Sequence, residues 1–476
     1  MATPGGKVKL PTKLAYGFGS SAYGIKDGGF AYFLLLFYGT VVGLDPGLVG
    51  LAIFLALVCD AISDPLVGYW SDNFHSKWGR RHPFMYAAAL PVALSYFMLW
   101  NPPDWGQAGL FWYVLILAIV IRTLITFYET PSSALLPELT QNYEERTSVQ
   151  TFRTFFGWFG GNALSVLMWG ALLVATAEYP VGILNRDGYA NYGIIASVLM
   201  FVAIMTSALG THGDIKHLRA PPPKSKMSFG KIFGEMFETL RDKSFLSLFI
   251  SVLFGNVATG FSGGLAFLML TFFWGFSPPQ IFLWSVLVFI SAFIALAIAP
   301  LLVKRFGKKP SVIGLGTIAF TLAPMPVLLR LLDMLPANGD PMLFPIVASF
   351  NTIDLGLIIA YQAVAYSMIG DLVEESELRT GRRSEGVFYA AITFTRKCSQ
   401  GLGAALAGGT LYLIAFPQGE AAANASDEKL WQLGATYAPM LWFLWASMLL
   451  AISFYRIDKT AHQANLDALA EGKTAA

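Results

Sequence analysis

The chain has 476 residues, of which 55% are hydrophobic and only 13% are charged, and its formal net charge is +2. Soluble domains contain about 25% charged residues, so this composition excludes a soluble protein. The small net charge leaves no large basic face, and we therefore expect no nucleic-acid partner. A mean hydropathy of +0.56 indicates an integral membrane protein.

Twelve apolar segments follow one another along the chain, and a helix of roughly 20 such residues crosses about 30 Å of hydrocarbon. We place them at residues 14–42, 47–71, 83–100, 108–137, 151–177, 191–210, 244–273, 279–303, 311–332, 343–371, 387–415 and 436–455. The runs are continuously apolar rather than alternating, which argues against an outer-membrane barrel. The sequence therefore predicts an all-α membrane protein with twelve transmembrane helices.

Lysines and arginines are concentrated in alternate loops between these segments. The N-terminal residues, with Lys7, Lys9 and Lys13, belong to the basic set, whereas the opposite loops carry only Arg186 and Lys429. Basic residues favour the cytoplasmic side of a membrane, so both termini are predicted to be cytoplasmic. No cleavable signal peptide is visible, and the first apolar segment is expected to remain as a helix.

The longest predicted cytoplasmic segment, residues 211–243, is proline-rich and basic and then becomes amphipathic. It divides the chain into a six-helix bundle at 1–210 and a second bundle with a cytoplasmic tail at 244–476. A weak internal repeat supports this division, since "WGRRHPF" follows the second span and "FGKKPSV" follows the eighth. Parallel six-helix repeats are typical of transporters whose substrate site lies between the two halves.

The second span contains two carboxylates, Asp60 and Asp64, although charge in hydrocarbon is expensive. Four residues apart, they lie on one face of a helix and repel each other. Either one of them holds a proton or a small cation lies between them, and oxygen ligands suit a hard cation such as Na⁺. The alternative is a structural role in which Asp64 caps a helix broken at "SDP".

Other buried charges extend this pattern. Glu129 shares a face of the fourth span with Thr126. It is either functional or a partner that neutralises Arg153 or Lys397. Because Lys397 lies deep in the eleventh span, it requires a carboxylate or a substrate. We expect much of the positive charge that compensates the first-half carboxylates to come from the second half. The sequence assigns no role to Lys26, Arg122, Asp354 and Arg396.

Acids and arginines also alternate where spans two and ten meet the predicted cytoplasmic side. Bidentate arginine–carboxylate pairs there predict a latch that holds one conformation, and ordinary positive-inside topology is the alternative. The predicted cytoplasmic gate consists of Asp72, Arg80, Arg81, Asp371, Glu374 and Arg382.

Several motifs along nearly the whole chain resemble one known family. They are "TKLAYGFG", "CDAISDPLVGYWSD" with "WGRRHPF", "TFYETPSSALLPELT", "FRTFFGWFGG", "IGDLVEESELRTGRRSEGVFYA" and "RKCSQGLGAALAG". In combination they resemble the glycoside–pentoside–hexuronide:cation symporters of the major facilitator superfamily, typified by melibiose permeases. The resemblance implies a multi-pass protein of the bacterial inner membrane that couples Na⁺ or H⁺ entry to uptake of a sugar or glycoside by alternating access.

The resemblance also implies roles for individual residues. Asp60, Asp64 and Thr126 match the family's cation site, and Glu129 matches an acid that hydrogen-bonds sugar hydroxyls. Arg153 and Lys397 match basic residues of the same cavity. The loop acids and arginines match the family's cytoplasmic gate.

Three departures from the family pattern concern the substrate. The family's sugar-binding aspartate of the first helix falls on Gly24, and Asp27, one turn later, is the predicted replacement. The sugar-stacking tryptophans fall on Ser133 and Gln362, and we include Gln362 in the substrate site. Lysolipid symporters of the same wider group share the acid pair and the lysine, so an amphipathic substrate is the alternative.

Two further classes of protein are considered. An enzyme is disfavoured because the five histidines lie in predicted cytoplasmic segments and no nucleophile–base pair is evident in the spans. A receptor without transport activity is the other class, and a substrate-induced uptake current would exclude it. We expect no resident cofactor, a co-transported Na⁺ or H⁺, a small-molecule substrate and a monomer in the lipid bilayer.

Overall fold

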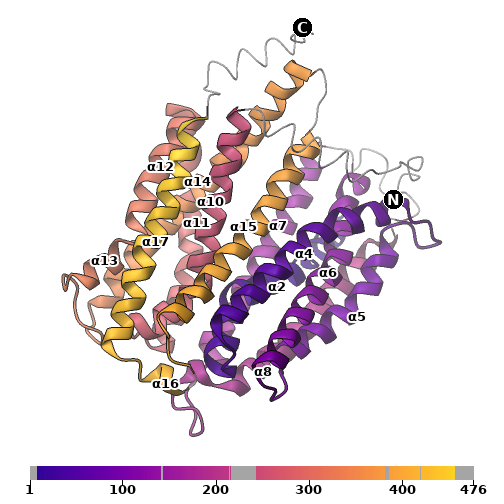
Figure 1. Ribbon diagram of the computed structural model, residues 1–476. Coiled ribbons are helices and arrows are strands. Elements are labelled where there is room, and N and C mark those ends of the chain that lie inside the picture. The colour runs from indigo at the N-terminus through magenta and orange to yellow at the C-terminus, as the bar shows by residue number, and fades with distance from the viewer. Residues whose placement is uncertain are drawn as a thin grey trace. The chain divides into compact units, whose positions relative to one another are not determined.

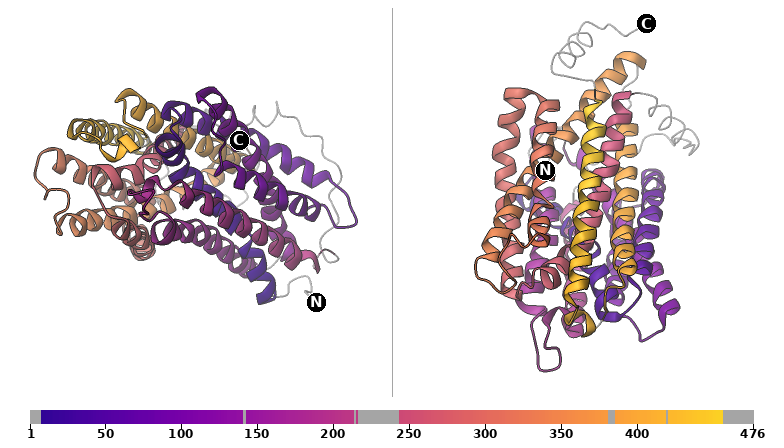
Figure 2. Two further views of the ribbon diagram at one scale, coloured as in Figure 1. Left: turned by 90° about the horizontal axis from the view of Figure 1, so that it is seen from below. Right: turned by 60° about the vertical axis from the view of Figure 1, so that its left-hand side comes forward.

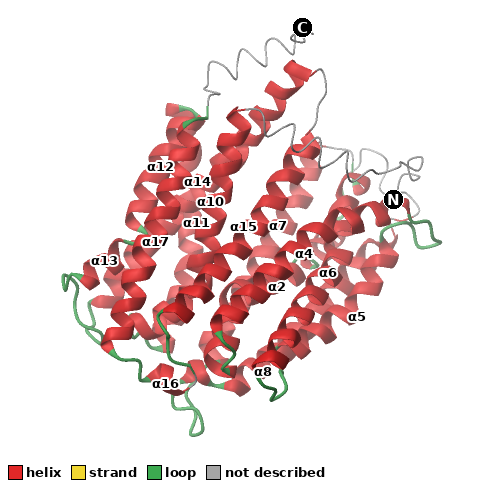
Figure 3. Ribbon diagram, viewed as in Figure 1, coloured by secondary structure: helices red, strands yellow, loops and turns green. Residues whose placement is uncertain are grey.

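The computed structural model describes residues 8–140, 143–213, 215, 243–380, 385–418 and 420–455. Some helical side chains within these ranges, including those of Asp72, Asp371 and Glu374, lie outside the description. All regular secondary structure in the described ranges is helical, and they contain no strand (Figure 3). The prediction of an all-α protein is confirmed.

The described residues contain eleven helical segments that are long and apolar enough to cross a membrane. They match the predicted spans closely, as Pro46–Ser71 against 47–71 and Gln107–Leu136 against 108–137 illustrate. The predicted span 387–415 coincides with the helix Glu385–Leu413, which is not among the eleven. The count of twelve and the cytoplasmic termini remain predictions.

The helices are labelled in chain order in Figure 1. From the N-terminus to residue 213 they are α1 (Leu10–Phe18), α2 (Ser21–Gly28), η1 (Gly29–Phe33), α3 (Leu34–Leu36), η2 (Phe37–Val42), α4 (Pro46–Asn73), α5 (His82–Leu99), α6 (Gln107–Leu139), α7 (Tyr143–Leu167), η3 (Met168–Leu172), η4 (Gly182–Leu184) and α8 (Arg186–His212). From residue 243 onward they are α10 (Lys243–Leu268), η6 (Met269–Phe273), α11 (Pro278–Phe306), α12 (Lys308–Leu322), α13 (Met325–Leu331), α14 (Leu343–Thr380), α15 (Glu385–Leu413), α16 (Glu420–Ala423) and α17 (Asp427–Ser453).

Packing divides the chain into two compact units, each described here by itself. The first comprises Met1–Met227, Gly263–Leu268 and Ala404–Asn424, and the second comprises the remaining residues. Within each unit the long helices run alongside one another (Figures 1 and 2). The predicted division at 211–243 stays a prediction, because residues 216–242 of that segment lie outside the description.

Small residues allow short pieces of α10 and α15 to join the first unit. A Cβ added to Gly408 would lie 2.1 Å from the carbonyl oxygen of Pro46, so α15 and the start of α4 are in backbone contact. The ring of Phe267, at the end of α10, stacks on Phe33 of η1 with centroids 5.0 Å apart. Close approach through glycine is the usual way for helices to associate in a membrane.

The same kind of contact fixes α2 against α7. A Cβ added to Gly24 would lie 1.8 Å from the carbonyl oxygen of Gly157, and one added to Gly161 would lie 2.5 Å from the carbonyl oxygen of Gly24. No side chain fits at position 24. The family's first-helix aspartate is therefore absent for a steric reason, since this position serves helix packing.

Helix α4 carries the acid pair and is continuous. Asp45 caps its N-terminus by accepting hydrogen bonds from the backbone N–H groups of Gly47 (2.7 Å) and Leu48 (3.3 Å). The helix then runs through Pro65 to Asn73 without interruption. The alternative reading, in which Asp64 caps a broken helix, is wrong, and both carboxylates project from the middle of one long helix.

Candidate cation and substrate site

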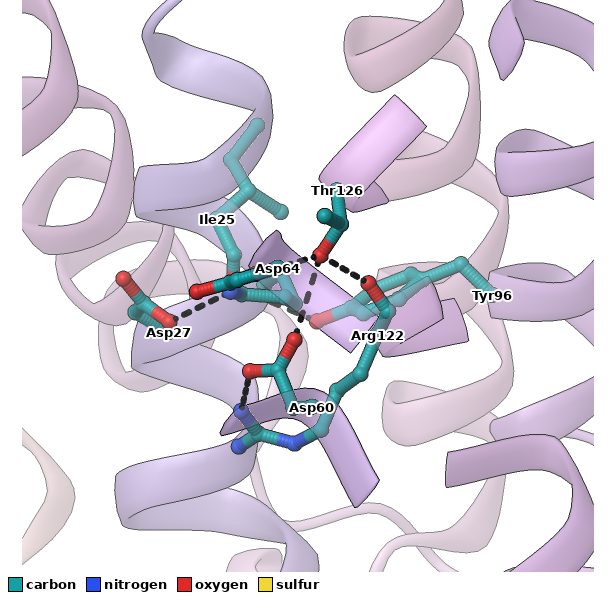
Figure 4. A network of polar contacts seen from close by, with 8 residues as sticks. Ile25, Asp27, Asp60, Asp64, Tyr96, Arg122 and Thr126 are labelled. Carbon is teal, nitrogen blue, oxygen red and sulfur yellow. Dashed lines mark hydrogen bonds and ion pairs between the residues drawn. The ribbon is translucent and has the colours of Figure 1, made fainter. Parts of the chain in front are cut away.

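Asp60 and Asp64 of α4 converge on one hydroxyl of α6 (Figure 4). The Oγ1 atom of Thr126 lies 3.1 Å from Oδ1 of Asp60 and 3.0 Å from Oδ1 of Asp64. It also lies 3.0 Å from the carbonyl oxygen of Arg122, one turn earlier in α6. Asp60 and Thr126 are each only 1% exposed. The structure thus brings together the three residues that the sequence assigns to the cation site.

The geometry around Thr126 provides too few protons for its oxygen atoms. A threonine hydroxyl carries one hydrogen, so it can satisfy only one of the three acceptors at a time. Four oxygen atoms, two from carboxylates, one from a carbonyl and one from the hydroxyl, therefore lie within 3.1 Å of one another's shared donor. Such a set of oxygens has the chemistry that binds a hard monovalent cation or an additional proton.

Arg122 is the partner that the sequence did not assign. Its Nη1 atom lies 3.1 Å from Oδ2 of Asp60, and the two side chains are 6% and 1% exposed. The guanidinium carbon also lies 4.6 Å from the ring centroid of Phe30, in the π-helical segment η1. The four-residue spacing of Arg122 and Thr126 was a usable signal, because it places both on one face of α6.

A second intramembrane ion pair lies in α2. The Nζ atom of Lys26 is 2.9 Å from Oδ1 of Asp27, and the lysine side chain is 4% exposed whereas the aspartate side chain is 62% exposed. Lys26 is also within electrostatic range of Asp60 and Glu129. Much of the compensating positive charge therefore comes from the first unit itself, and the expectation that it would come from the second half is wrong.

Glu129 and Arg153 belong to the same unit. Arg153 is buried, its Nη2 atom donates a hydrogen bond to Oγ of Ser133 (2.8 Å), and its guanidinium carbon lies 5.1 Å from the ring centroid of Tyr16. Glu129, which is half-buried, lies within electrostatic range of both Arg153 and Lys26. Ser133, where the family has a tryptophan, thus participates in a polar contact with Arg153.

Two predicted substrate residues lie in the second unit. Gln362 of α14 lines a mostly apolar cavity of about 50 Å³, in which the hydroxyl groups of Ser251 and Tyr361 lie 3.2 Å apart. Lys397 of α15 is half-buried and its neighbour Arg396 is exposed. Substrate contact by these residues stays a prediction.

Asp354 is a buried carboxyl in the second unit. It lies on α14 with 7% exposure, and its Oδ1 atom has no hydrogen-bond partner among the residues that the structure describes. Ile358, one turn along the same helix, lines the cavity that includes Gln362.

The predicted gate lies largely outside the description. The side chains of Asp72, Asp371 and Glu374 and all of Arg382 belong to the residues that are not described. Of the remaining members, Arg81 is buried, with its Nη1 atom 3.5 Å from Oγ of Ser71, and Arg80 is half-buried. The latch stays a prediction.

Comparisons with known proteins agree with this architecture. The chain is 28% identical over 533 residues to an uncharacterized symporter of Synechocystis, covering 96% of both chains. It is 23% identical to the isoprimeverose transporter of Lactiplantibacillus pentosus, with 90% and 84% covered. It is also 23% identical to the sodium-dependent lysophosphatidylcholine symporter 1 of Gallus gallus, with 83% and 77% covered.

Solved structures show the same fold. The nucleoside transporter NupG superimposes with a TM-score of 0.63 at 15% identity, covering 92% of this chain and 99% of that one. The proteins found in both comparisons are membrane transporters rather than enzymes, as the sequence predicts. The family model described as MFS/sugar transport protein matches residues 15–459. The chain therefore belongs to the MFS/sugar transport protein family, and its resemblance to glycoside–pentoside–hexuronide:cation symporters is confirmed.

Proposed function

We propose that this protein is a cation-coupled symporter of the bacterial inner membrane, in which Na⁺ or H⁺ binds at Asp60, Asp64 and Thr126. The observation that carries the proposal is the convergence of three acceptor oxygens on the single hydroxyl proton of Thr126, at 3.0–3.1 Å. A bound cation would use these oxygens as ligands, and a bound proton would supply the missing donor. Either ligand lowers the cost of burying two neighbouring carboxylates.

Coupling to substrate follows from the position of Glu129. It lies three residues after Thr126 on the same face of α6, so a cation that draws α4 towards α6 also changes the setting of this acid. Cation and substrate then favour each other, and the coupling is reciprocal. Alternating access produces symport if neither partly loaded form changes conformation readily.

We propose a sugar or glycoside as the substrate, held by Asp27, Glu129 and Arg153 in the first unit and by Gln362 and Lys397 in the second. The exposed carboxylate of Asp27 and the buried guanidinium of Arg153 supply the acceptor and donor that hydroxyl groups require. The isoprimeverose transporter among the relatives supports this class of substrate.

A lysolipid or another amphipathic solute is the second candidate. Two observations favour it. Positions 133 and 362 carry serine and glutamine instead of aromatic platforms, and the cavity beside Gln362 is mostly apolar. A lysophosphatidylcholine symporter is among the relatives.

The topology that we propose has twelve spans, with α15 as the eleventh, both termini cytoplasmic, and a cytoplasmic latch formed by the loop acids and arginines. The protein is proposed to act as a monomer.

One screen tests the function and separates the substrates. The purified protein is heated with sugars, glycosides or lysolipids, with and without Na⁺ and at several pH values. A ligand that binds the native form raises the unfolding temperature, and the rise should grow with the coupling ion. The ligand identified is then offered to proteoliposomes under an inward Na⁺ or H⁺ gradient, with Asp64→Asn as the matched variant. Uptake that neither gradient drives, or that Asp64→Asn leaves fully concentrative, would contradict the proposal.

A further inference from the structure

Arg122 is a positive charge built into the proposed cation site. Its pair with Asp60 is buried on both sides, with Nη1 and Oδ2 3.1 Å apart. Its remaining hold is the ring of Phe30, 4.6 Å from the guanidinium carbon, and its buried Nε has no hydrogen-bond partner among the described residues. A guanidinium has five N–H donors and cannot be deprotonated in a protein, so this charge is permanent.

The charge balance around the site follows from these contacts. Asp60 and Asp64 together carry two negative charges, and Arg122 cancels one of them. The nearby acids have their own basic neighbours, since Lys26 pairs with Asp27 and Arg153 lies within electrostatic range of Glu129. One monovalent cation therefore makes the group of Asp60, Asp64 and Arg122 neutral, which is the state that a low-dielectric interior favours.

The oxygen geometry permits the arginine and a cation to be present together. Arg122 contacts Oδ2 of Asp60, whereas the Thr126 hydroxyl faces Oδ1 of the same carboxylate. The oxygens that converge on Thr126 thus lie on the side of Asp60 away from the guanidinium nitrogen. A cation bound there would share Asp60 with Arg122 rather than displace it.

We propose that Arg122 is a tethered counter-ion that restricts this site to a single monovalent cation. The proposal rests on the cation site proposed above and adds what sets its charge and its ion class. Without Arg122 the two carboxylates and two neutral oxygens would form a doubly negative oxygen site, which suits a divalent ion such as Ca²⁺. With Arg122 in place, a divalent ion would leave an uncompensated positive charge in the membrane interior.

A purely structural arginine gives the opposite expectation for cation binding. If Arg122 only held α4 against α6, its removal would loosen the site and weaken binding. If it is a counter-ion, its removal strengthens binding, because a positive charge close to the cation disappears. The sign of the change therefore distinguishes the two roles.

The experiment measures Na⁺ and Ca²⁺ binding to the full-length protein by equilibrium dialysis with ²²Na⁺ and ⁴⁵Ca²⁺. For Arg122→Gln we expect the half-saturating Na⁺ concentration to fall about tenfold or more and Ca²⁺ binding to appear. Arg122→Lys keeps the charge and should stay within about threefold of the wild type. Asp60→Asn leaves Asp64 and Arg122 with no net charge and should abolish binding.

The double variant Asp60→Asn with Arg122→Gln covers the case in which Arg122→Gln alone fails to fold. It removes both members of the buried pair, which is far less damaging than leaving one charge unpaired. It restores a single negative charge at Asp64, so Na⁺ binding should return relative to Asp60→Asn.

Each outcome decides between the explanations. Unchanged or weaker Na⁺ binding in folded Arg122→Gln, or a double variant as inactive as Asp60→Asn, overturns the counter-ion role alone. A wild-type protein that neither binds Na⁺ nor couples uptake to H⁺ overturns the proposed function, and the counter-ion role with it.

Discussion

The hydroxyl of Thr126 offers the sharpest test of the cation site. Thr126→Val keeps the shape of the side chain and removes the one group that faces both carboxylates, at 3.0 and 3.1 Å. In the empty site the hydroxyl satisfies at most one acceptor. In the loaded site its oxygen would serve as a ligand while its proton still serves an acceptor. The substitution therefore removes more from the loaded state than from the empty one.

The size of this effect follows from the partners. A hydrogen bond to a charged group contributes about 1.5–3 kcal/mol. At about 1.4 kcal/mol for each factor of ten, the cation affinity should fall by roughly 10- to 150-fold. Because the side chain is buried, water is poorly placed to replace the hydroxyl.

The assay is the Na⁺ concentration that gives half of the maximal thermal stabilisation of the purified protein. Thr126→Ser is the matched control, since it retains the hydroxyl and should stay within a few-fold of the wild type. The reasoning is refuted if Thr126→Val keeps the wild-type Na⁺ dependence, or if Thr126→Ser loses as much affinity as Thr126→Val.

Other predictions concern the fold around the site. Gly24→Ala should destabilise the protein by about 3 kcal/mol or more, because its Cβ would lie 1.8 Å from a backbone oxygen, whereas Gly28→Ala, with a nearest contact of 3.4 Å, should be tolerated. Unfolding temperatures of the two variants compare them directly. Asp354→Leu has a similar shape and should raise the unfolding temperature, because the buried carboxyl lacks a partner at Oδ1. Asp45→Ala should lower stability by about 1 kcal/mol through loss of the α4 cap, whereas Asp104→Ala, which breaks an exposed ion pair with Arg186, should have almost no effect. Equal effects of Asp45→Ala and Asp104→Ala would contradict the capping argument.

The elements and the core of the site could be predicted from the sequence because they depend on local properties. Uninterrupted apolar runs of sufficient length define spans such as Pro46–Ser71 to within one residue. The spacing of Asp60 and Asp64 places them on one helical face, and the family resemblance adds Thr126. The structure then brings the three together.

The partners of these groups could not be predicted, because they depend on how neighbouring helices are rotated. Arg122 lies four residues before Thr126, but only the packing of α4 against α6 shows that it contacts Asp60. The same limit applies to Lys26, whose pairing with Asp27 depends on the local helix geometry just before η1. Steric exclusion at Gly24 likewise arises from the approach of α7.

The position of the oxygen cluster suggests how a small ion could influence a large carrier. All of its ligands come from two helices, α4 and α6, and its shortage of protons is greatest when the site is empty. A bound cation therefore adds attraction between these two helices without adding contacts elsewhere. Glu129 lies less than one helical turn from Thr126, so the path from ion to substrate is a single turn of α6. Coupling over so short a distance requires only that α4 and α6 have two stable spacings, and the net charge left by Arg122 determines which one the empty carrier prefers.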